Sequence, residues 1–397
     1  MGFDCRPIIV HIVQSLEGGG TERFLIALLQ ALHVGRFRHS VITLRGAGPL
    51  ASQLPGDVAC YPMEVSGRSW LAGWRAAQAI APLRPAVIHA RNTGCWGDAV
   101  IAGVLTPCAR VVLGFHGLDN ASHFARRQRF VMRWGLRWGA RFTSVSNAGA
   151  SKMRREAGIR SEQIDILPNG VKVANYGKRS ENERREVRQS LAISDSEVVV
   201  GTVGSLTAVK GHAQLLEAFA HLAGTMKDMK LLIVGDGPLR GALTRQAADA
   251  GVADRVCFTG WRDDVALLHS AMDVYVCASA TEGMSNAVVE AMASGLSIVA
   301  TDVGDNALLL RDGRDGLIIK SQSPKAIAQA VRRFAESPGL RRELGEAARV
   351  RAQAFEFDRA VQNYERYYGD LVASKARRRR TMVGWRGMRR SQFSDCT

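Results

Sequence analysis

The sequence lacks any long uninterrupted apolar run, although 46% of its 397 residues are hydrophobic. A transmembrane helix needs about 20 predominantly apolar residues, so no membrane-spanning helix is predicted. The N-terminal segment MGFDCRPIIVHIVQ has a short apolar run followed by a glycine-rich loop, which argues against a signal peptide. Arg6 occupies the position where a myristoylation signal requires serine or threonine. We therefore expect a cytoplasmic, globular protein of two or three domains.

Clustered cysteines are also lacking. Seven cysteines are scattered singly, with no CxxC pair and no Cys/His cluster, at positions 5, 60, 95, 108, 257, 277 and 396. Isolated thiols of this kind are typical of a reducing cytoplasm and exclude a disulfide framework or a zinc finger. No metal site is predicted.

Acidic residues are few relative to basic ones, 37 against 53, which gives a net charge of +16. Residues 375–397 hold eight basic residues and one acidic residue, so +7 of this charge lies in the last 23 positions. A cationic surface favours nucleic acid, anionic lipid or phosphorylated substrates. Because no recognisable nucleic-acid-binding motif accompanies the charge, we expect no specific nucleic-acid partner.

Short β-branched runs alternate with helical patterns in both halves of the chain, which predicts parallel sheets built from βαβ units. The expected strands are 7–13, 40–44, 86–90, 110–115 and 142–145, then 197–203, 231–235, 256–260, 273–277 and 297–301. Helices are expected near 324–335, 338–353 and 357–372.

This pattern predicts two doubly wound, Rossmann-like domains that face each other across a cleft. The predicted boundaries are 1–174 for the first domain, 175–196 for a charged linker with a short helix, 197–355 for the second domain, 356–374 for a closing helix and 375–397 for a basic, disordered tail. Ligands of such sheets bind at the carboxyl ends of strands and at helix N-termini, so the loops there are the candidate sites.

Glycine-rich loops follow the first strand of each half. Glu17 to Arg23, EGGGTER, precedes an apolar helix whose free N–H groups could meet a phosphate. A plain strand-to-helix turn is the alternative, although three consecutive glycines exceed what a turn needs. The loop matches neither GxGxxG nor GxxxxGK[ST], so a dinucleotide dehydrogenase or a P-loop ATPase is not supported. Lys210, in the loop TVGSLTAVKGH, could bind a diphosphate through its positive charge. Without the other motifs, the alternative of an ordinary exposed lysine would be preferred.

The stretch EGMSNAVVE, residues 282 to 290, places two carboxylates around a predicted helix start. Glu282 precedes the helix, and Glu290 lies about two turns inside it. Carboxylates that bind hydroxyl groups indicate a polyhydroxylated ligand, while the neighbouring amides and the other loops offer phosphate sites. A sugar nucleotide has both features.

Six motifs occur in the order typical of the retaining group 1 glycosyltransferases, family 4, which have the GT-B fold. They are GGTER (19–23), FHG (115–117), VSNA (145–148), PNGV (168–171), VGSLTAVKG (203–211) and SATEGMSNAVVEAMASGLSIVATDVGD (279–305). The chain resembles this family over about residues 7–372. The resemblance implies transfer of a sugar from a nucleoside-diphosphate donor, with no cofactor and no essential metal.

The resemblance also implies roles for particular residues. Catalysis would involve His116, near the anomeric carbon and the acceptor, together with Lys210, which would neutralise the diphosphate, and Glu282, which would hold the donor sugar. Glu290 would bind the ribose hydroxyls. The remaining donor-binding candidates are Gly19, Gly20, Gly260, Trp261, Gly283, Met284, Ser285 and Asn286.

Two positions depart from the family pattern. Ser205 stands where the family commonly has arginine, which removes one expected cation from the diphosphate site; Arg23 or Arg262 could replace it. Leu308 stands where the family often has glutamate, after the turn Asp305-Asn306. Asp263-Asp264 is read as a helix cap and not as a metal-binding DxD motif.

Residues 124–142, FARRQRFVMRWGLRWGARF, repeat arginines and aromatics near helical spacing. One reading is a helix that packs its aromatics on the sheet. The other is a contact with the anionic inner membrane surface through Arg129, Arg133, Trp134, Arg137 and Trp138. The tail is read either as a solvated run or as a second membrane contact.

The leading hypothesis is a cytoplasmic enzyme, peripheral on the inner face of the cytoplasmic membrane. It would move a hexose or N-acetylhexosamine to a glycan or polyprenyl-linked acceptor in surface polysaccharide synthesis. The alternatives are a nucleotide-sugar epimerase of similar fold and a degenerate, non-catalytic sugar-nucleotide or polyanion-binding protein.

Overall fold

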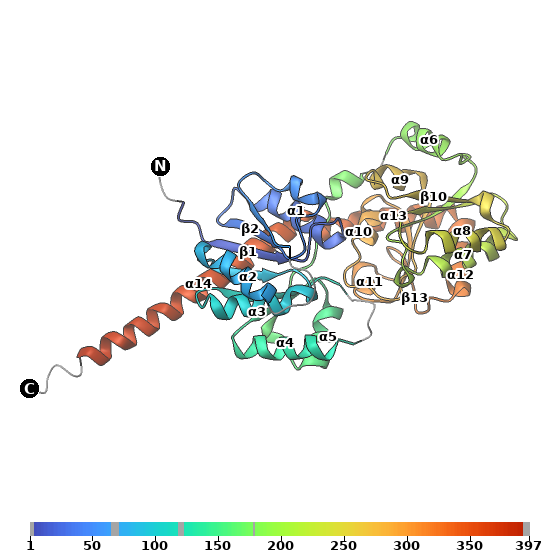
Figure 1. Ribbon diagram of the computed structural model, residues 1–397. Helices are drawn as coiled ribbons and strands as arrows, with labels where there is room; N and C mark the ends of the chain where they lie inside the picture. The colour runs from blue at the N-terminus through green and yellow to red at the C-terminus, as the bar shows by residue number, and fades with distance from the viewer. Residues whose placement is uncertain (1–3, 65–70, 118–122, 178, 392–397) are drawn as a thin grey trace, which may run out of the picture.

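The computed structural model describes residues 4–64, 71–117, 123–177 and 179–391. Two parallel sheets lie in separate lobes, each with helices on both faces (Figure 1). The predicted α/β class with two doubly wound halves is confirmed, because every pairing between the named strands is parallel.

The first sheet has seven strands in the order β3-β2-β1-β4-β5-β6-β7. Their bounds are β1 Ile8–Val13, β2 Arg38–Thr43, β3 Ala59–Pro62, β4 Val87–Ala90, β5 Arg110–Phe115, β6 Arg141–Ser144 and β7 Ile164–Ile166. The five expected strands of this half are present within two residues at either end. β3 and β7, which form the two edges, are short and partly exposed and lack the apolar run that marks a buried strand.

The second sheet has six strands in the order β10-β9-β8-β11-β12-β13. Their bounds are β8 Val198–Val203, β9 Met229–Val234, β10 Val256–Gly260, β11 Val274–Cys277, β12 Ser297–Thr301 and β13 Leu317–Ile319. In both sheets the strand order reverses between the first strand and the fourth, and loops at such a reversal form a ligand site at the carboxyl ends. β8 and β11 are therefore neighbours although 70 residues of chain lie between their ends.

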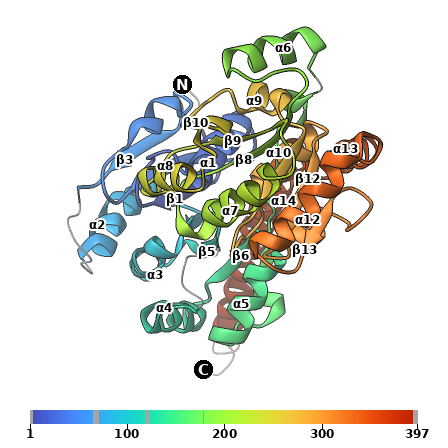
Figure 2. The same cartoon turned by 90° about the vertical axis from the view of Figure 1, so that its right-hand side faces the viewer.

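Helices connect the strands. Those of the first lobe are α1 Gly20–Leu32, α2 Leu71–Ile80, α3 Trp96–Leu105, α4 Arg126–Arg137 and α5 Asn147–Ala157. Those that follow are α6 Glu181–Ser190, α7 His212–Ala223, α8 Arg240–Asp249, α9 Val265–Ala271, α10 Asn286–Ala293, α11 Asn306–Leu309, α12 Pro324–Glu336, α13 Pro338–Ala352 and α14 Phe357–Ser391. Turning the molecule shows α12 and α13 side by side over the second sheet (Figure 2).

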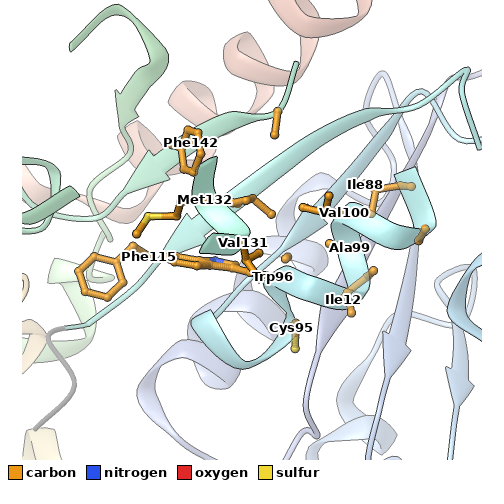
Figure 3. Close-up of a cluster of buried hydrophobic side chains, with 14 of the residues drawn as sticks. Ile12, Ile88, Cys95, Trp96, Ala99, Val100, Phe115, Val131, Met132 and Phe142 are labelled. Atoms are coloured by element: carbon orange, nitrogen blue, oxygen red, sulfur yellow. The ribbon is translucent and has the colours of Figure 1, made fainter. Parts of the chain in front are cut away.

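The core of the first lobe is built around Trp96, which is fully buried between α3 and β5. Its ring packs near Phe115 and Phe124, with centroids 6.2 and 5.8 Å away, and its indole N–H donates to the Gly114 carbonyl at 2.9 Å. Figure 3 shows Met132 and Val131 of α4 directed into the same cluster. Burying such large apolar side chains contributes about 1.5–3 kcal/mol each, so this core fixes the position of the loop after β5.

The chain crosses between the lobes twice, and the two crossings lie side by side. The Val171 N–H donates to the Phe355 carbonyl at 3.0 Å, and the Phe357 N–H donates back to the Val171 carbonyl at 3.0 Å. Beyond this point α14 packs on the first sheet through Tyr364 and Tyr368 (Figure 1). The segment 175–196, expected to be a linker with a short helix, contains α6, whose Arg188 is buried against the second lobe.

The structure extends α14 to Ser391, past residue 374, where we predicted a disordered tail to begin. Residues 375–391 include seven arginines and a lysine, which are good helix formers, and contain no proline, and extending an existing helix avoids the cost of nucleation. Residues 392–397 of the predicted tail lie outside the described part of the chain. Within the part that the structure describes, none of the helices combines the length and apolar character needed to cross a bilayer.

Candidate active site

An ion pair at the carboxyl edge of the second sheet joins two of the predicted site residues. The Lys210 ammonium donates to Glu282 Oε1 at 2.6 Å, and the Ser279 hydroxyl donates to the same oxygen at 2.7 Å. Burial opposes the charge of Lys210, but the neighbouring Glu282 carboxylate outweighs it and raises the pKa of Lys210. A fixed cation therefore stands beside a buried carboxylate, an arrangement suited to a phosphate and a sugar hydroxyl.

The loop after Glu282 leads into α10 with no side chain capping the helix start. Ser285 is the N-cap residue, and its hydroxyl makes no capping hydrogen bond. The α1 helix of the first lobe begins in the same way, with Gly19 as an N-cap that has no capping side chain. The first N–H groups of a helix have no partner within it, so each of these starts can receive an anion. An added Cβ at Gly20 would meet no atom within 4 Å, so its backbone is open to a ligand.

The two lobes contact each other at this loop. A Cβ added to Gly283 would lie 3.5 Å from Gly117 Cα and 3.7 Å from the His116 carbonyl oxygen. His116 follows β5 and is half-buried, and its Nδ1 has no hydrogen-bond partner among the described residues. Burial, with a smaller contribution from the Arg91 charge, lowers the pKa of His116 to about 3, so the imidazole is neutral at physiological pH.

Glu290 lies inside α10 and is partly buried. Burial raises the pKa of this carboxyl to about 7; a hydrogen bond from the Tyr176 hydroxyl and the Arg23 charge act in the opposite direction. Burial disfavours the charged form of this carboxyl group, and hydrogen bonds donated by a ligand would stabilise that charged form. Glu290 can therefore accept from a pair of hydroxyl groups.

Arg23 connects the first-lobe glycine loop to the second lobe. Its Nε donates to the Gly18 carbonyl at 3.1 Å, its Nη1 lies 3.5 Å from Asp263, and its guanidinium sits over the Trp261 ring at 4.9 Å. Trp261 is 57% exposed and follows Gly260, whose φ of +71° favours glycine. The predicted donor residues of both lobes are thus close together, with Arg23 between them.

A second contact between the lobes involves Asp305. Its carboxylate accepts from the backbone N–H of Asn147 at 2.7 Å and of Ala148 at 2.9 Å, and from the Asn147 side-chain amide at 3.2 Å. These groups form the N-terminus of α5, so a side chain of one lobe caps a helix of the other. An anion at this position is stabilised by the helix dipole as well as by the hydrogen bonds.

Family models match both halves of the chain. Residues 18–175 match the model of glycosyltransferase family 4, and residues 183–351 match the model of group 1 glycosyl transferases. The chain belongs to the family 4 glycosyltransferases.

Curated relatives agree with this assignment. A 2-deoxystreptamine glucosyltransferase of Streptomyces kanamyceticus is 30% identical over 211 residues, 52% of this chain and 54% of the relative. The UDP-Gal:alpha-D-GlcNAc-diphosphoundecaprenol alpha-1,3-galactosyltransferase of Escherichia coli is 26% identical over 296 residues, 72% of this chain and 75% of the relative. For most of these relatives the chain spans about half of their length, for example 57% of the putative glycosyltransferase EpsD of Bacillus subtilis.

Solved structures confirm the predicted GT-B fold. A glycosyltransferase from Rickettsia africae superposes with a TM-score of 0.81 at 18% identity, covering 93% of this chain and 99% of that one. Anabaena Alr3699/HepE in complex with UDP and glucose superposes with a TM-score of 0.80 at 21% identity, covering 91% and 99%. At these identities the likeness establishes the fold alone.

Several site residues of this family 4 glycosyltransferase were not found by sequence reasoning. The Ser279 hydroxyl hydrogen-bonds Glu282, and the Tyr176 hydroxyl hydrogen-bonds Glu290. Asp305 accepts a hydrogen bond from Asn147 of the other lobe. Ser279 lies three residues before Glu282, a spacing that could have been noticed. Tyr176 lies in the segment read as a linker, and nothing in its local sequence marks it.

The positions that depart from the family pattern are both exposed. Ser205 brings no cation to the loop, and Arg262 is engaged by Asp264 at 2.7 Å, which leaves Arg23 as the better-placed replacement. Leu308 is 54% exposed.

Asp264 does stand at the N-cap position of α9, as predicted, but its side chain binds Arg262 and makes no capping hydrogen bond. Among the described residues, no three His, Cys, Asp or Glu side chains are grouped so as to hold a metal ion.

The predicted basic helix is α4, which is shorter than the repeat in the sequence because Gly139, at φ +76°, follows its end. Trp134 packs against the core, as the first reading expected, and Arg129 is half-buried. Arg133 and Arg137 are exposed, together with two large aromatics, Phe130 (67% exposed) and Trp138 (62% exposed). The structure therefore leaves a smaller cationic and aromatic face than the sequence suggested.

Proposed function

We propose that this protein transfers a hexose or N-acetylhexosamine from a nucleoside-diphosphate sugar to a glycan or lipid-linked glycan acceptor in surface polysaccharide synthesis. The observation that carries the proposal is the Lys210–Glu282 pair, which lies just before the uncapped start of α10, where the backbone of Gly283 approaches His116 and Gly117 of the other lobe. Cation, carboxylate and free amides are the groups that a sugar diphosphate requires.

Each part of the donor has a candidate partner. Lys210 and the α1 and α10 amides would neutralise the diphosphate as it leaves, Glu282 would hold the sugar, and Glu290 would accept from the ribose hydroxyls. The loop Gly260-Trp261 would meet the base. In support, Alr3699/HepE was solved with UDP and glucose, and the Escherichia coli relative is named for a UDP-galactose donor and a diphosphoundecaprenol-linked acceptor.

The stereochemistry and the metal requirement are part of the same proposal. We propose retention of configuration at the anomeric carbon, as the resemblance to the retaining family implies. Because Lys210 and helix N-termini can stabilise a departing diphosphate, the transfer would need no metal ion. His116, neutral at physiological pH, would orient the acceptor or the anomeric centre by hydrogen bonding.

The first test is a binding panel of UDP, GDP, ADP and their common sugar conjugates, measured by calorimetry without metal. We expect one nucleotide family to bind, and Glu290→Gln to weaken it about 10- to 100-fold, because the amide keeps one oxygen acceptor but loses the charge and one hydrogen bond to it. Glu217→Gln, at an exposed position of α7, is the matched control and should leave the affinity unchanged. Binding unaffected by Glu290→Gln would reject the ribose assignment, and no binding at all would favour the degenerate alternative.

The same panel has an expected pH dependence. In the free protein Glu290 is mostly protonated below its pKa of about 7 and ionised above it. Since the ionised form accepts the ribose hydroxyls, affinity should rise between pH 6 and pH 8. The Glu290→Gln variant controls for the nucleotide's own phosphate ionisation; an identical pH profile in the variant would contradict the role of Glu290.

We further propose a peripheral site of action, on the anionic inner face of the cytoplasmic membrane, through the exposed face of α4. Each cation near such a surface contributes about 1 kcal/mol, so Arg133→Gln with Arg137→Gln should weaken binding to phosphatidylglycerol vesicles about 10- to 30-fold. Lys325→Gln with Arg333→Gln, on exposed positions of α12, removes the same charge elsewhere. Equal losses in the two double variants, measured by cosedimentation, would refute a specific α4 contact.

A further inference from the structure

A pocket of about 380 Å³ lies at the amino-terminal edge of the second sheet, away from the donor site. Its lining includes Asp273, which precedes β11, and Ser297, the first residue of β12. Lys210 and Glu282, by contrast, follow the carboxyl ends of β8 and β11. The volume lies within the range of small-molecule sites.

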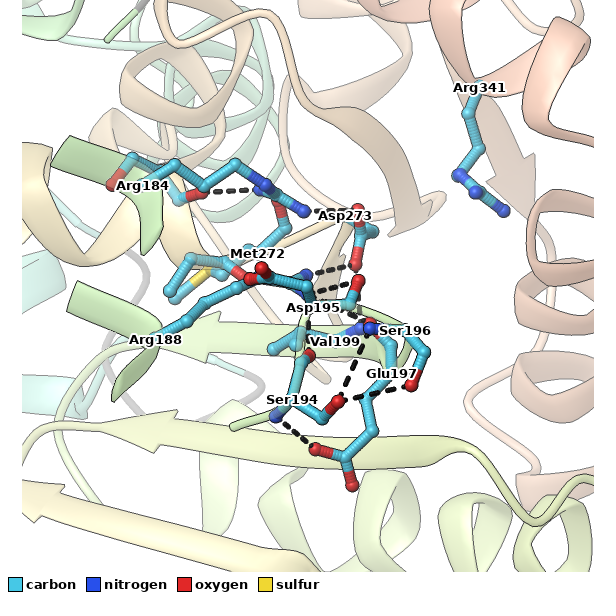
Figure 4. Close-up of polar contacts among 12 residues, drawn as sticks. Arg184, Arg188, Ser194, Asp195, Ser196, Glu197, Val199, Met272, Asp273 and Arg341 are labelled. Atoms are coloured by element: carbon cyan, nitrogen blue, oxygen red, sulfur yellow. Dashed lines mark hydrogen bonds and ion pairs between the residues drawn. The ribbon is translucent and has the colours of Figure 1, made fainter. Parts of the chain in front are cut away.

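The lining of this pocket is rich in arginine. Four arginines face two carboxylates, and the residues are Arg179, Arg184, Arg341, Arg342, Glu181 and Asp273. Asp273 is already shared, since Arg184 binds it at 2.8 Å and the buried Arg188, which is 1% exposed, binds it at 2.7 Å. Figure 4 shows Arg184 and Arg188 both directed at Asp273. Arg179 pairs with Glu183 at 3.5 Å, and the remaining arginines leave the pocket an excess of positive charge.

Backbone carbonyl groups hold Arg184 and Arg341 of this pocket in place. Arg184 also donates to the carbonyls of Ser270 and Met272, so its guanidinium is fixed against the sheet edge. Arg341 Nη1 donates to the carbonyls of Phe334 and Ala335 at 2.7 and 3.0 Å, at the end of α12. Figure 4 draws Arg341 apart from the Arg184–Asp273 pair, with no interaction joining them. Guanidinium groups fixed in advance lose little entropy when they bind an anion.

Two features add to the positive potential. Arg342 is exposed and, within the described ranges, has no ion-pair partner. Both Arg341 and Arg342 lie in the first turns of α13, a helix of 15 residues whose N-terminal end carries partial positive charge. The Ser337 hydroxyl accepts from the Leu340 N–H and Pro338 has no N–H, so α13 contributes through its dipole while the arginines supply the hydrogen bonds. Each guanidinium can bind a phosphate group through two parallel hydrogen bonds.

Side chains at the floor of the pocket connect it to Glu290 of the donor site. His269 lines the pocket, and its Nδ1 lies 2.9 Å from Ser294 Oγ, while the Ser294 hydroxyl donates to the Glu290 carbonyl at 3.0 Å. The His269 ring also packs near Tyr176, with centroids 5.8 Å apart, and the Tyr176 hydroxyl bonds the Glu290 carboxyl. One layer of side chains separates the pocket from Glu290.

We propose that this arginine-lined pocket binds a small, soluble phosphate monoester, at a site separate from the donor site. Binding there does not depend on the proposed glycosyl transfer. A second expectation does rest on it: because His269 lines the pocket and packs near Tyr176, whose hydroxyl bonds Glu290, a bound ester should change the affinity of the Glu290 site for nucleotide, and the change is reciprocal.

The test uses the full chain carrying Lys210→Gln, which removes the cation of the donor site, with glucose 6-phosphate as the probe and glucose as the uncharged control. Calorimetry should find one site for glucose 6-phosphate and none for glucose. Adding Arg342→Glu should weaken binding at least about tenfold, because a charge-assisted contact becomes repulsive. Arg333→Glu, an equal charge reversal at an exposed position of α12, should leave the affinity within about twofold.

Three results would overturn the proposal. They are no binding to the Lys210→Gln protein, equal weakening by Arg342→Glu and Arg333→Glu, or Arg342-dependent recruitment to phosphatidic acid vesicles without binding of the soluble ester. The last would assign the pocket to a lipid headgroup. For the coupling, nucleotide affinity of the otherwise unaltered protein is measured with and without saturating glucose 6-phosphate, and an unchanged value would exclude it.

Discussion

Replacing Lys210 by methionine is expected to lower turnover about 10²- to 10³-fold, the largest loss we expect from a single substitution in the donor site. A diphosphate leaving group develops charge as the glycosidic bond breaks, and removing one fixed electrostatic partner of such a charge has this order of effect. Lys210 is held at 2.6 Å from Glu282, so its ammonium is already in place before the donor binds. The measurement is nucleoside-diphosphate release at saturating donor and acceptor, after the binding panel has identified the donor.

Stability has to be separated from chemistry in this experiment. Lys210→Met leaves Glu282 buried with only Ser279 as a partner, so we also expect a loss of about 1–2 kcal/mol in the free energy of unfolding, modest because the Lys210 side chain is 30% exposed. The double variant Lys210→Met with Glu282→Gln removes the unpaired carboxylate charge, so it should recover part of the lost stability. Lys210→Arg keeps the charge and should retain more turnover than Lys210→Met. If folded Lys210→Met protein turned over at a near-normal rate, Lys210 would not be the leaving-group partner.

The Lys210–Glu282 pair also illustrates which features of the site could be predicted from the sequence and which could not. Both residues were predicted as site residues because each follows a buried strand in a recognisable motif. Their direct contact across 72 positions follows from β8 and β11 being hydrogen-bonded neighbours, and that depends on the strand order. Local patterns predict where a strand ends, while strand order is decided by packing of the whole lobe.

The elements that sequence reasoning missed share a physical cause. β3, β7 and β13 are edge strands of three or four residues, which lack the long apolar run that marks a strand buried on both faces. Tyr176 contacts Glu290 from a segment of polar and charged residues, so its role depends on where the crossing chain lies. Arg188, in the same segment, is buried because Asp273 and backbone carbonyls satisfy it, which no charge pattern reveals.

Asp305 links the two lobes through three hydrogen bonds to its carboxylate. In the family pattern this turn is glycine-rich and is often followed by a glutamate, whereas here the carboxylate stands at 305 and leucine at 308. Asp305 is buried, and its two oxygens accept from both backbone N–H groups that open α5. A charge-assisted hydrogen bond contributes about 1.5–3 kcal/mol and a carboxylate at a helix start about 0.3–1 kcal/mol, so the contact favours a closed arrangement of the lobes.

Asp305→Ala is therefore expected to open the molecule. A loss of about 3 kcal/mol from this contact would shift the ratio of closed to open forms roughly 100-fold towards the open form, because every 1.4 kcal/mol is a factor of ten. In solution scattering the radius of gyration should increase, and turnover should fall because His116 and Glu282 no longer face each other. Asp305→Asn, which keeps an oxygen acceptor without the charge, should give an intermediate result.

The matched control is Asp302→Asn, an exposed position in the same turn with the same change in charge. It should leave both scattering and turnover unchanged. An unaltered radius of gyration in Asp305→Ala, combined with a lower melting temperature, would mean that Asp305 only caps α5 and does not set the arrangement of the lobes. If the lobes open but turnover is retained, closure through Asp305 is not needed for transfer, and the ligand itself must bring Glu282 and His116 together.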